Sequence, residues 1–215
     1  MVHTKPTISY AITVCNEVTE INQLLNFLVK HKHKDDEIVV LFDNNGQRQN
    51  IKDVLIAFTK EPGFKWIDST FTKDFSKWKN ELKSHCTGKW IFNIDADEMP
   101  QLSLMKHVRK LLNVLGLFDL IWVPRINTVT DYTQQDVDSF GWRIHKKGWI
   151  NWPDYQCRLF KNKPHLTWQN TVHEVLVGAK FEAHLPAWTG AYFALTHPKD
   201  IQRQRAQNSF YDTLE

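Results

Sequence analysis

The sequence has few cysteines and no long apolar run, and each shortage excludes a class of protein. Three cysteines occur among 215 residues, and because Cys15, Cys86 and Cys157 are far apart and form no CxxC pair, neither a disulfide framework nor a zinc cage is predicted. No segment approaches the roughly 20 apolar residues of a membrane-spanning helix, so any membrane contact would have to be peripheral. The apolar run 8–15 lacks a small-residue cleavage site and indicates a strand. We therefore expect a soluble, cytoplasmic protein.

The composition is that of one ordinary globular domain, apart from a surplus of tryptophan. Hydrophobic residues make up 42% and charged residues 24% of the chain, which excludes a disordered or fibrous protein. The formal net charge of +3 is too small to indicate nucleic-acid binding, although it is compatible with a polyanionic partner. The nine tryptophans suit stacking on sugars or bases, but packing in a core is their more frequent role. Composition alone leaves the partner open.

Apolar runs alternate with helical patterns through the first half of the chain, which predicts βαβ units. The first unit joins a strand at 8–14 to a helix at 18–31, and a second strand at 37–42 ends in the turn-forming residues 43–46. We expect further helices at 50–60 and 75–85 and further strands at 64–67 and 89–94. The fold class is therefore α/β, a single domain with a mostly parallel, Rossmann-like central sheet flanked by helices.

The second half of the chain is less regular. Residues 101–115 have the pattern of an amphipathic helix, and a buried strand is expected at 117–124. Residues 127–154 are polar, aromatic and irregular, so we expect a long loop there that forms the recognition surface. The remaining expected elements are strands at 157–160 and 192–196 and a polar helix at 199–214.

Acidic and amide side chains follow the predicted strands. Asn16-Glu17, Asp43 and Asp95-Ala96-Asp97 all come directly after a strand, and the carboxyl ends of parallel strands meet at one crevice. The Asp95 and Asp97 carboxylates, two residues apart, suit a hard divalent cation that also binds phosphate. Solvated turn acids would give the same short DxD pattern, but three acids after an apolar strand favour a bound cation that relieves their repulsion. The sequence therefore predicts Mg²⁺ or Mn²⁺ at this edge.

Five ordered motifs together resemble the family 2 glycosyltransferases of the GT-A fold. They are Ile12–Glu17, Phe42–Asn44, Lys79-Asn80, Ile94–Glu98, and a later group of Arg158–Phe160, Trp168, Val172–Glu174 and Thr196-His197. The later group is similar to the acceptor half of bacterial members that build lipopolysaccharide cores. The resemblance spans nearly the whole chain and divides it into a nucleotide-sugar half at 1–99, an acceptor half at 100–198 and a closing helix at 199–215.

The resemblance implies a nucleotide-diphospho-sugar donor, with a UDP-sugar as first choice, and Mn²⁺ or Mg²⁺ as cofactor. Asp97 and His197 would bind the metal, and Asp95 would contact the metal, its water or the ribose. The other implied substrate-binding residues are Thr13, Asn16, Glu17, Asp43, Lys79, Arg158, Trp168 and His173. The family often has an Asp-Gly-Ser turn where this chain has Asp43-Asn44-Asn45-Gly46, so the donor stays open.

Glu174 is the expected catalytic base. Inversion at the anomeric carbon requires a carboxylate that takes the proton of the acceptor hydroxyl, and His173 would orient it. The spacing alone also fits a His173-Glu174 pair with a purely structural role. The family resemblance favours Glu174 as the catalytic base. The implied reaction is metal-dependent, inverting transfer to a glycan, a lipopolysaccharide, a protein or the hydroxylated base of phage DNA.

Two other functions are open at this point. A nucleotidyltransferase also uses acidic metal ligands on an α/β sheet, but the Gly-rich phosphate loop is absent. A noncatalytic carbohydrate- or nucleic-acid-binding module would use Trp142, Trp149, Trp152 and Trp168 as stacking platforms. The acid cluster together with Glu174 favours the enzyme.

Overall fold

The structure is a computed structural model that describes residues 7–46 and 48–213. The strands of the main sheet are β1 (Ile8–Val14), β2 (Glu37–Asp43), β3 (Phe64–Ser69), β4 (Trp90–Asp95), β5 (Met99–Pro100), β6 (Leu120–Thr130), β7 (Ile150–Lys161), β10 (Glu182–His184) and β11 (Leu195–Asp200). The helices are α1 (Val18–His31), α2 (Gln49–Ala57), α3 (Phe75–Ser84), α4 (Leu102–Val114), α5 (Gln134–Ser139), η1 (Ala187–Phe193) and α6 (Ile201–Asp212). A separate two-stranded sheet joins β8 (Thr167–Gln169) to β9 (Val175–Val177).

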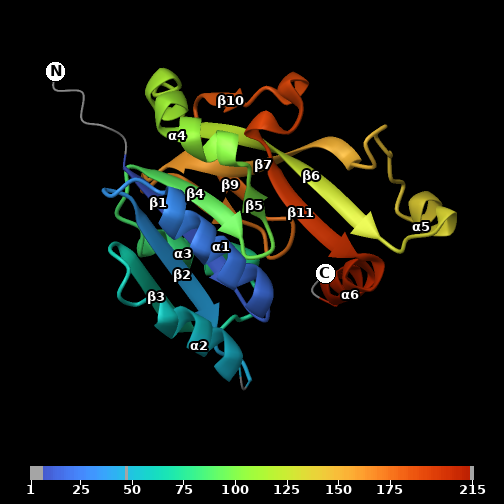
Figure 1. The fold of residues 1–215 in the computed structure, drawn as a ribbon, viewed down its shortest axis with the longest axis horizontal. Helices are drawn as coiled ribbons and strands as arrows, with labels where there is room; N and C mark the ends of the chain where they lie inside the picture. Colours follow the sequence, from blue (N-terminus) through green and yellow to red (C-terminus); the bar gives the residue numbers. More distant parts are fainter. Residues whose placement is uncertain (1–6, 47, 214–215) are drawn as a thin grey trace.

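The main sheet has the order β3-β2-β1-β4-β7-β6-β11-β5, with β10 beside β6 (Figure 1). Strands β3, β2, β1 and β4 are parallel, as the βαβ units predict. Strand β7 runs antiparallel between β4 and β6, and β11 and β10 are parallel to β6. The expected α/β class with a mostly parallel central sheet is confirmed.

Helices cover both faces of the sheet because successive strand residues point to opposite sides. Ile8, Tyr10 and Ile12 of β1 pack with α1, α2 and α4, and α1 crosses in front of the sheet in Figure 1. Ala11 of β1 belongs to a second core with α3 and the β8–β9 sheet. Strand β1 is buried on both faces, so its sequence is a continuous apolar run rather than an alternating one.

Two expectations for the second half are wrong in part. The loop expected at 127–154 contains the end of β6, helix α5 and the start of β7. This end of β6 is paired with β11 and carries polar residues such as Asn127, so it lacks an apolar strand signature. The strand expected at 192–196 begins only at Leu195, because a 3₁₀ helix with Gly190 at φ +66° precedes it.

The closing helix begins later than expected. Lys199 belongs to β11, and α6 starts at Ile201, where the Asp200 side chain accepts a hydrogen bond of 2.8 Å from the Arg203 amide. Its expected last residue, Leu214, lies outside the described residues. Strands β5, β8, β9 and β10 were not predicted, because segments of two or three residues are too short to show a period. Within the described residues, no helix is both long and apolar enough to cross a bilayer.

Candidate active site

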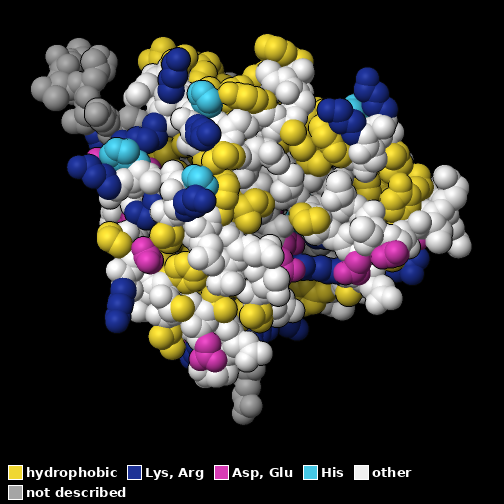
Figure 2. All heavy atoms as spheres, in the orientation of Figure 1, with side chains coloured by type: hydrophobic (Ala, Val, Ile, Leu, Met, Phe, Trp, Pro, Cys, Tyr) yellow, Lys and Arg dark blue, Asp and Glu magenta, His cyan; other side chains and the backbone are white. Residues whose placement is uncertain are grey.

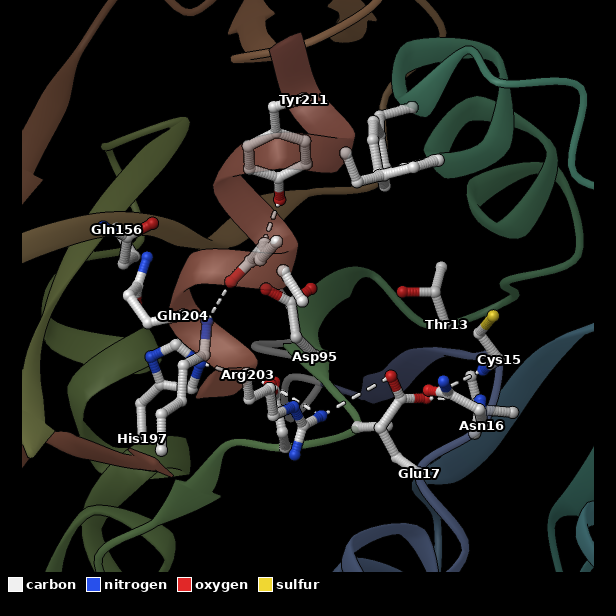
Figure 3. Close-up of a pocket in the computed structure, with 18 of the residues that line it drawn as sticks. Thr13, Cys15, Asn16, Glu17, Asp95, Gln156, His197, Arg203, Gln204 and Tyr211 are labelled. Carbon is white, nitrogen blue, oxygen red and sulfur yellow. Dashed lines mark hydrogen bonds and ion pairs between the residues drawn. The ribbon is translucent and has the colours of Figure 1, made fainter. Parts of the chain in front are cut away.

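The carboxyl ends of β1, β2 and β4 open into one cleft of about 1010 Å³, which α6 covers from the other side (Figure 3). Most of the residues singled out in the sequence line this cleft. They are Thr13, Asn16, Glu17, Asp43, Lys79, Asp95, Asp97, Arg158, His173, Glu174 and His197. Trp168 is not in the lining, since its side chain is buried with 4% exposure.

Asp95 is neutralised by basic side chains of the protein. Its Oδ2 accepts a hydrogen bond from Arg158, and its Oδ1 lies 3.9 Å from the Lys79 ammonium. Burial alone would raise the pKa of Asp95, but the charges of Arg158, Lys79 and Arg125 hold that pKa well below its usual value. Asp95 is therefore a carboxylate at neutral pH and forms a fixed acceptor at the floor of the cleft.

Glu98, the third acid of the cluster, has a structural role. Its side chain is fully buried and accepts hydrogen bonds of 2.6 Å from Arg158 and 3.0 Å from Arg125. Its Oε2 also accepts from the Asp95 amide at 3.3 Å. Two arginines from β6 and β7 thus relieve much of the acid repulsion for which a bound cation was expected.

Asp97 faces the opposite wall of the cleft. Its Oδ2 lies 3.3 Å from His197 Nε2 and 3.3 Å from Arg203 Nη2, and His197 Nδ1 is 2.8 Å from Asn127 Oδ1. Burial would raise the pKa of Asp97, but the hydrogen bond and charge of His197 lower it overall. The Asn127 contact fixes the orientation of the imidazole, as a hydrogen bond to the other ring nitrogen does for a metal-binding histidine.

The predicted metal ligands are only partly grouped. Among the described residues, no set of three or more His, Cys, Asp or Glu side chains is arranged to hold a metal ion. Asp97 and His197 do lie together, whereas Asp95 is held by Arg158. One or two protein ligands are enough for an ion that also binds substrate phosphates and water, so this pair fits Mg²⁺ or Mn²⁺.

Lys79 joins the acid cluster to the candidate base. Its ammonium donates a hydrogen bond to Glu174 Oε1 and lies 4.8 Å from the centroid of the Trp168 ring. Asn80, the next residue on α3, bonds both backbone groups of Trp168, at 2.8 and 2.9 Å. The buried Trp168 ring therefore supports the Lys79 side chain. This contact explains why Trp168 belongs to the later group of motif residues although it does not line the cleft.

The two carboxylates expected near the nucleoside are held by backbone amides. Asp43 Oδ1 accepts from the amides of Asn45 and Phe71 at 3.1 and 3.0 Å, and its Oδ2 contacts Arg48 at 2.5 Å. Burial opposes ionisation of Asp43, but these hydrogen bonds lower its pKa overall. Glu17 Oε2 similarly accepts from the Cys15 and Asn16 amides at 2.9 and 3.0 Å. These contacts shape the turns at the mouth of β1 and β2.

Helix α6 closes the cleft through contacts that the sequence did not reveal. Arg203 points from α6 towards Glu17, at 3.6 Å, and donates to Glu20 at 2.8 Å (Figure 3). Tyr211 lies about two turns further along α6. Its ring packs edge-on against Phe75 and His173, with ring centroids 5.8 and 5.9 Å apart. No local pattern in this polar helix indicates those partners, which are distant in sequence.

Comparison of the sequence with protein families gives a match over most of the chain. The family described as Glycosyl transferase family 2 matches residues 9–170. The chain therefore belongs to glycosyl transferase family 2, as its motifs suggested. The finer likeness to enzymes of the lipopolysaccharide core stays a prediction.

Curated relatives match a part of their own length. The prophage-derived glycosyltransferase SunS of Bacillus subtilis is 29% identical over 135 residues, which are 61% of this chain and 30% of SunS. A TPR repeat-containing protein of Synechococcus elongatus is 26% identical over 166 residues, 77% of this chain and 35% of that protein. The chain thus spans about a third of these relatives.

Solved structures share the fold at low identity. The crystal structure of S. aureus TarS 1–349 has a TM-score of 0.62 at 12% identity, over 89% of this chain and 60% of TarS 1–349. The same protein in complex with UDP-GlcNAc has a TM-score of 0.60 at 13% identity, over 90% and 58% of the two chains. These similarities support the GT-A assignment of the fold.

Proposed function

We propose that this chain is a metal-dependent, inverting glycosyltransferase that moves a sugar from a nucleotide-diphospho-sugar to an acceptor hydroxyl. The observation that carries the proposal is the chain of contacts across one cleft. Lys79 contacts both Asp95 and Glu174, so the DxD turn and a candidate base face the same space. Family membership supports this reading over a nucleotidyltransferase.

A UDP-sugar is the proposed donor. The solved relative TarS binds UDP-GlcNAc, and the matching region of this chain has a cleft with room for a nucleotide sugar. We place the nucleoside at the turns held by Asp43 and Glu17, beside Thr13 and Asn16, and the ribose near Asp95. The first half, 1–99, would then bind the donor, and 100–198 would bind the acceptor beneath the closing helix.

Asp97 and His197 would hold Mn²⁺ or Mg²⁺. When bound, the ion would neutralise the charge that develops on the leaving diphosphate. The protein would supply the rest of the positive charge near that group from Lys79 and Arg158, with Arg203 at the closing helix. These roles agree with the finding that no group of three or more metal-binding side chains occurs in the described part of the chain.

Glu174 would act as the general base. It precedes β9 in a loop where His173 adopts φ +52°, and the Lys79 ammonium holds its side chain in the cleft by a hydrogen bond. A deprotonated carboxylate would accept the hydroxyl proton as the acceptor oxygen attacks the anomeric carbon and the carbon–oxygen bond to the diphosphate breaks.

Calorimetric titration with a panel of nucleotide sugars tests the proposal. Binding of a UDP-sugar in Mn²⁺, lost on adding chelator, is the expected result, and donor hydrolysis should follow the same metal dependence. Binding of nucleoside triphosphates in preference to nucleotide sugars would favour the nucleotidyltransferase. Folded protein that binds no nucleotide at all would favour a noncatalytic binding module.

A further inference from the structure

A short hairpin at the rim of the cleft carries basic residues and no acid. We call residues 143–151 the basic hairpin; its sequence is Arg-Ile-His-Lys-Lys-Gly-Trp-Ile-Asn. Backbone hydrogen bonds of 2.8 Å join Asn151 to Arg143, His145 to Trp149 and Gly148 to His145. Gly148 adopts φ +76° at its turn, a conformation that glycine allows without strain. The hairpin is therefore an ordered element of the fold.

The three cations of the hairpin are not neutralised by the rest of the protein. Arg143, Lys146 and Lys147 are exposed, and none forms an ion pair with a carboxylate in the part of the chain that the structure describes. Lys79 and Arg158 inside the cleft differ, since each contacts a carboxylate. In Figure 2, Lys and Arg side chains gather on the projection that this segment forms at the right of the view.

Aromatic contacts hold Lys147, one of these cations, and the neighbouring His145 in place. The Trp149 ring stacks on His145 with centroids 5.2 Å apart and planes 19° apart, and the Lys147 ammonium lies 4.9 Å from its centroid. Trp152 packs edge-on against the same ring at 4.8 Å. Trp149 is thus occupied by basic neighbours, so it positions charge rather than offering a free stacking face.

The base of the hairpin meets the candidate catalytic centre. Ile150 and Asn151 line the cleft, and Ile150 is paired in the sheet with Asn127, whose side chain contacts His197. Trp142, directly before the hairpin, also lines the cleft. A ligand held by the hairpin would therefore extend towards the Asp97–His197 pair from the β6–β7 side, away from the nucleoside turns at β1 and β2.

From this arrangement we infer that the basic hairpin is an acceptor subsite for an anionic glycan, one whose sugars carry phosphate or carboxylate groups. The inference rests on the proposed function, because it assigns the acceptor of that reaction. Exposed cations at the rim of the cleft, without carboxylate partners in the described part of the chain, match a saccharide that carries negative charge. Three cations in nine residues can bind a glycan that carries a few anionic groups. Duplex DNA binding typically uses more, about six to ten phosphate contacts.

Matched saccharides test the subsite by direct titration without donor. The probes are mannopentaose phosphate, mannopentaose and pentagalacturonic acid, with single-stranded oligodeoxythymidine as the nucleic-acid arm. We expect the two charged saccharides to bind and the neutral one not to bind, with weaker binding as salt rises from about 0.05 to about 0.5 M. Whichever of the two charged saccharides binds more tightly shows whether phosphate or carboxylate is the recognised group.

A triple variant and a matched control locate the site. The variant carries Arg143→Gln, Lys146→Gln and Lys147→Gln, and the control carries Lys60→Gln, Lys106→Gln and Lys110→Gln, which remove the same charge from exposed positions on or beside α2 and α4. The hairpin variant should bind the charged saccharides about tenfold more weakly, and the control should bind them as the unmodified chain does.

Four results would overturn the inference, and three of them concern relative binding. They are equal binding of the neutral saccharide, equal weakening by both triple variants, and oligodeoxythymidine binding as tight as that of the charged saccharides. Failure of every charged saccharide to bind would also overturn it. Nucleotide-sugar binding by the hairpin variant, expected within twofold of the unmodified chain, reports separately on the proposed function, so the two ideas can fail independently.

Discussion

The Lys79 ammonium donates a hydrogen bond to the Glu174 carboxylate, although 95 residues separate them. The two side chains come from α3 and from the loop before β9. This contact fixes the position of the Glu174 carboxylate in the cleft, which a general base requires. It also gives Lys79 a role that does not depend on direct contact with the donor.

Glu174→Gln should abolish transfer and leave donor binding unchanged. The amide keeps the shape of the side chain and a hydrogen-bonding oxygen for Lys79, but it cannot take the acceptor proton, so kcat should fall about 10²- to 10⁴-fold. Titration with the donor and a transfer assay separate the two effects. A variant with weak donor binding and a normal kcat would assign Glu174 to the substrate site instead.

Asp97→Ala should remove the metal dependence of donor binding. Without the carboxylate, His197 alone would hold the ion, so Mn²⁺ should strengthen donor binding in the unmodified chain and have little effect in the variant. The matched control is Asp138→Ala, an exposed acid outside the cleft lining. Retention of the full Mn²⁺ effect in Asp97→Ala would contradict the metal assignment.

Glu98→Gln should destabilise the protein strongly. The side chain is fully buried between Arg125 and Arg158, and loss of its charge leaves two buried cations with less compensation. Breaking a buried ion pair in this way costs about 3–5 kcal/mol, measured as the free energy of unfolding in urea. Asp97→Asn, on the same turn but partly exposed, should lose much less. Equal stabilities for the two variants would show that Glu98 has no structural role.

Asp119 should make the stability depend on acid pH. Burial would raise its pKa, but Lys163, the Lys180 amide and Lys161 lower it to about 2, below the ordinary value of about 3.9. The charged form therefore stabilises the fold above about pH 4, and this contribution is lost as pH falls from about 4 to about 2.

Asp119→Asn should remove about 1–2 kcal/mol of stability at neutral pH, a figure reduced to allow for solvent near the exposed Lys163. It should also flatten the fall in stability below pH 4. Urea unfolding at a series of pH values measures both effects. Asp53→Asn, on the exposed side of α2, is the control, and a pH profile that Asp119→Asn leaves unchanged would rule the explanation out.

Arg203→Gln should loosen α6 without unfolding the domain. The side chain ties the helix to Glu17, Glu20 and Asp97, and such partly exposed pairs contribute about 1 kcal/mol or less to overall stability. Hydrogen exchange should therefore become several-fold faster in α6 and stay constant in the central sheet. Arg205→Gln, on the same helix but paired with Asp136, is the control for the general effect of charge removal.

The parts of the fold that sequence could predict are those with local, periodic signals. The βαβ units from β1 to β4 follow from apolar runs and helical spacing, and the convergence of Asp43, Asp95 and Asp97 follows from the geometry of parallel strands. The resemblance to the family pointed to the DxD turn and to Glu174, and their roles stay predictions. These elements needed no knowledge of long-range partners.

The other features of the fold and the site depend on contacts between residues far apart in sequence, which no local pattern predicts. Glu98 looks like another acid of the turn, and only its pairing with Arg125 and Arg158, 27 and 60 residues further on, shows that it is structural. Trp168 looked like a stacking platform, but it is buried beneath Lys79. The polar end of β6 lacks an apolar period because it faces a cleft and a neighbouring strand rather than a core.

The Arg203–Glu20 contact joins residues 183 positions apart and closes the cleft with a helix that follows all strands of the central sheet. During synthesis, the strands that supply the acids leave the ribosome long before α6 does. The central sheet can therefore form while the cleft is still uncovered, and the wall that Arg203 supplies is added last. A nascent chain that stops before residue 203 would lack this wall, so the order of synthesis makes it the last part of the proposed site to form.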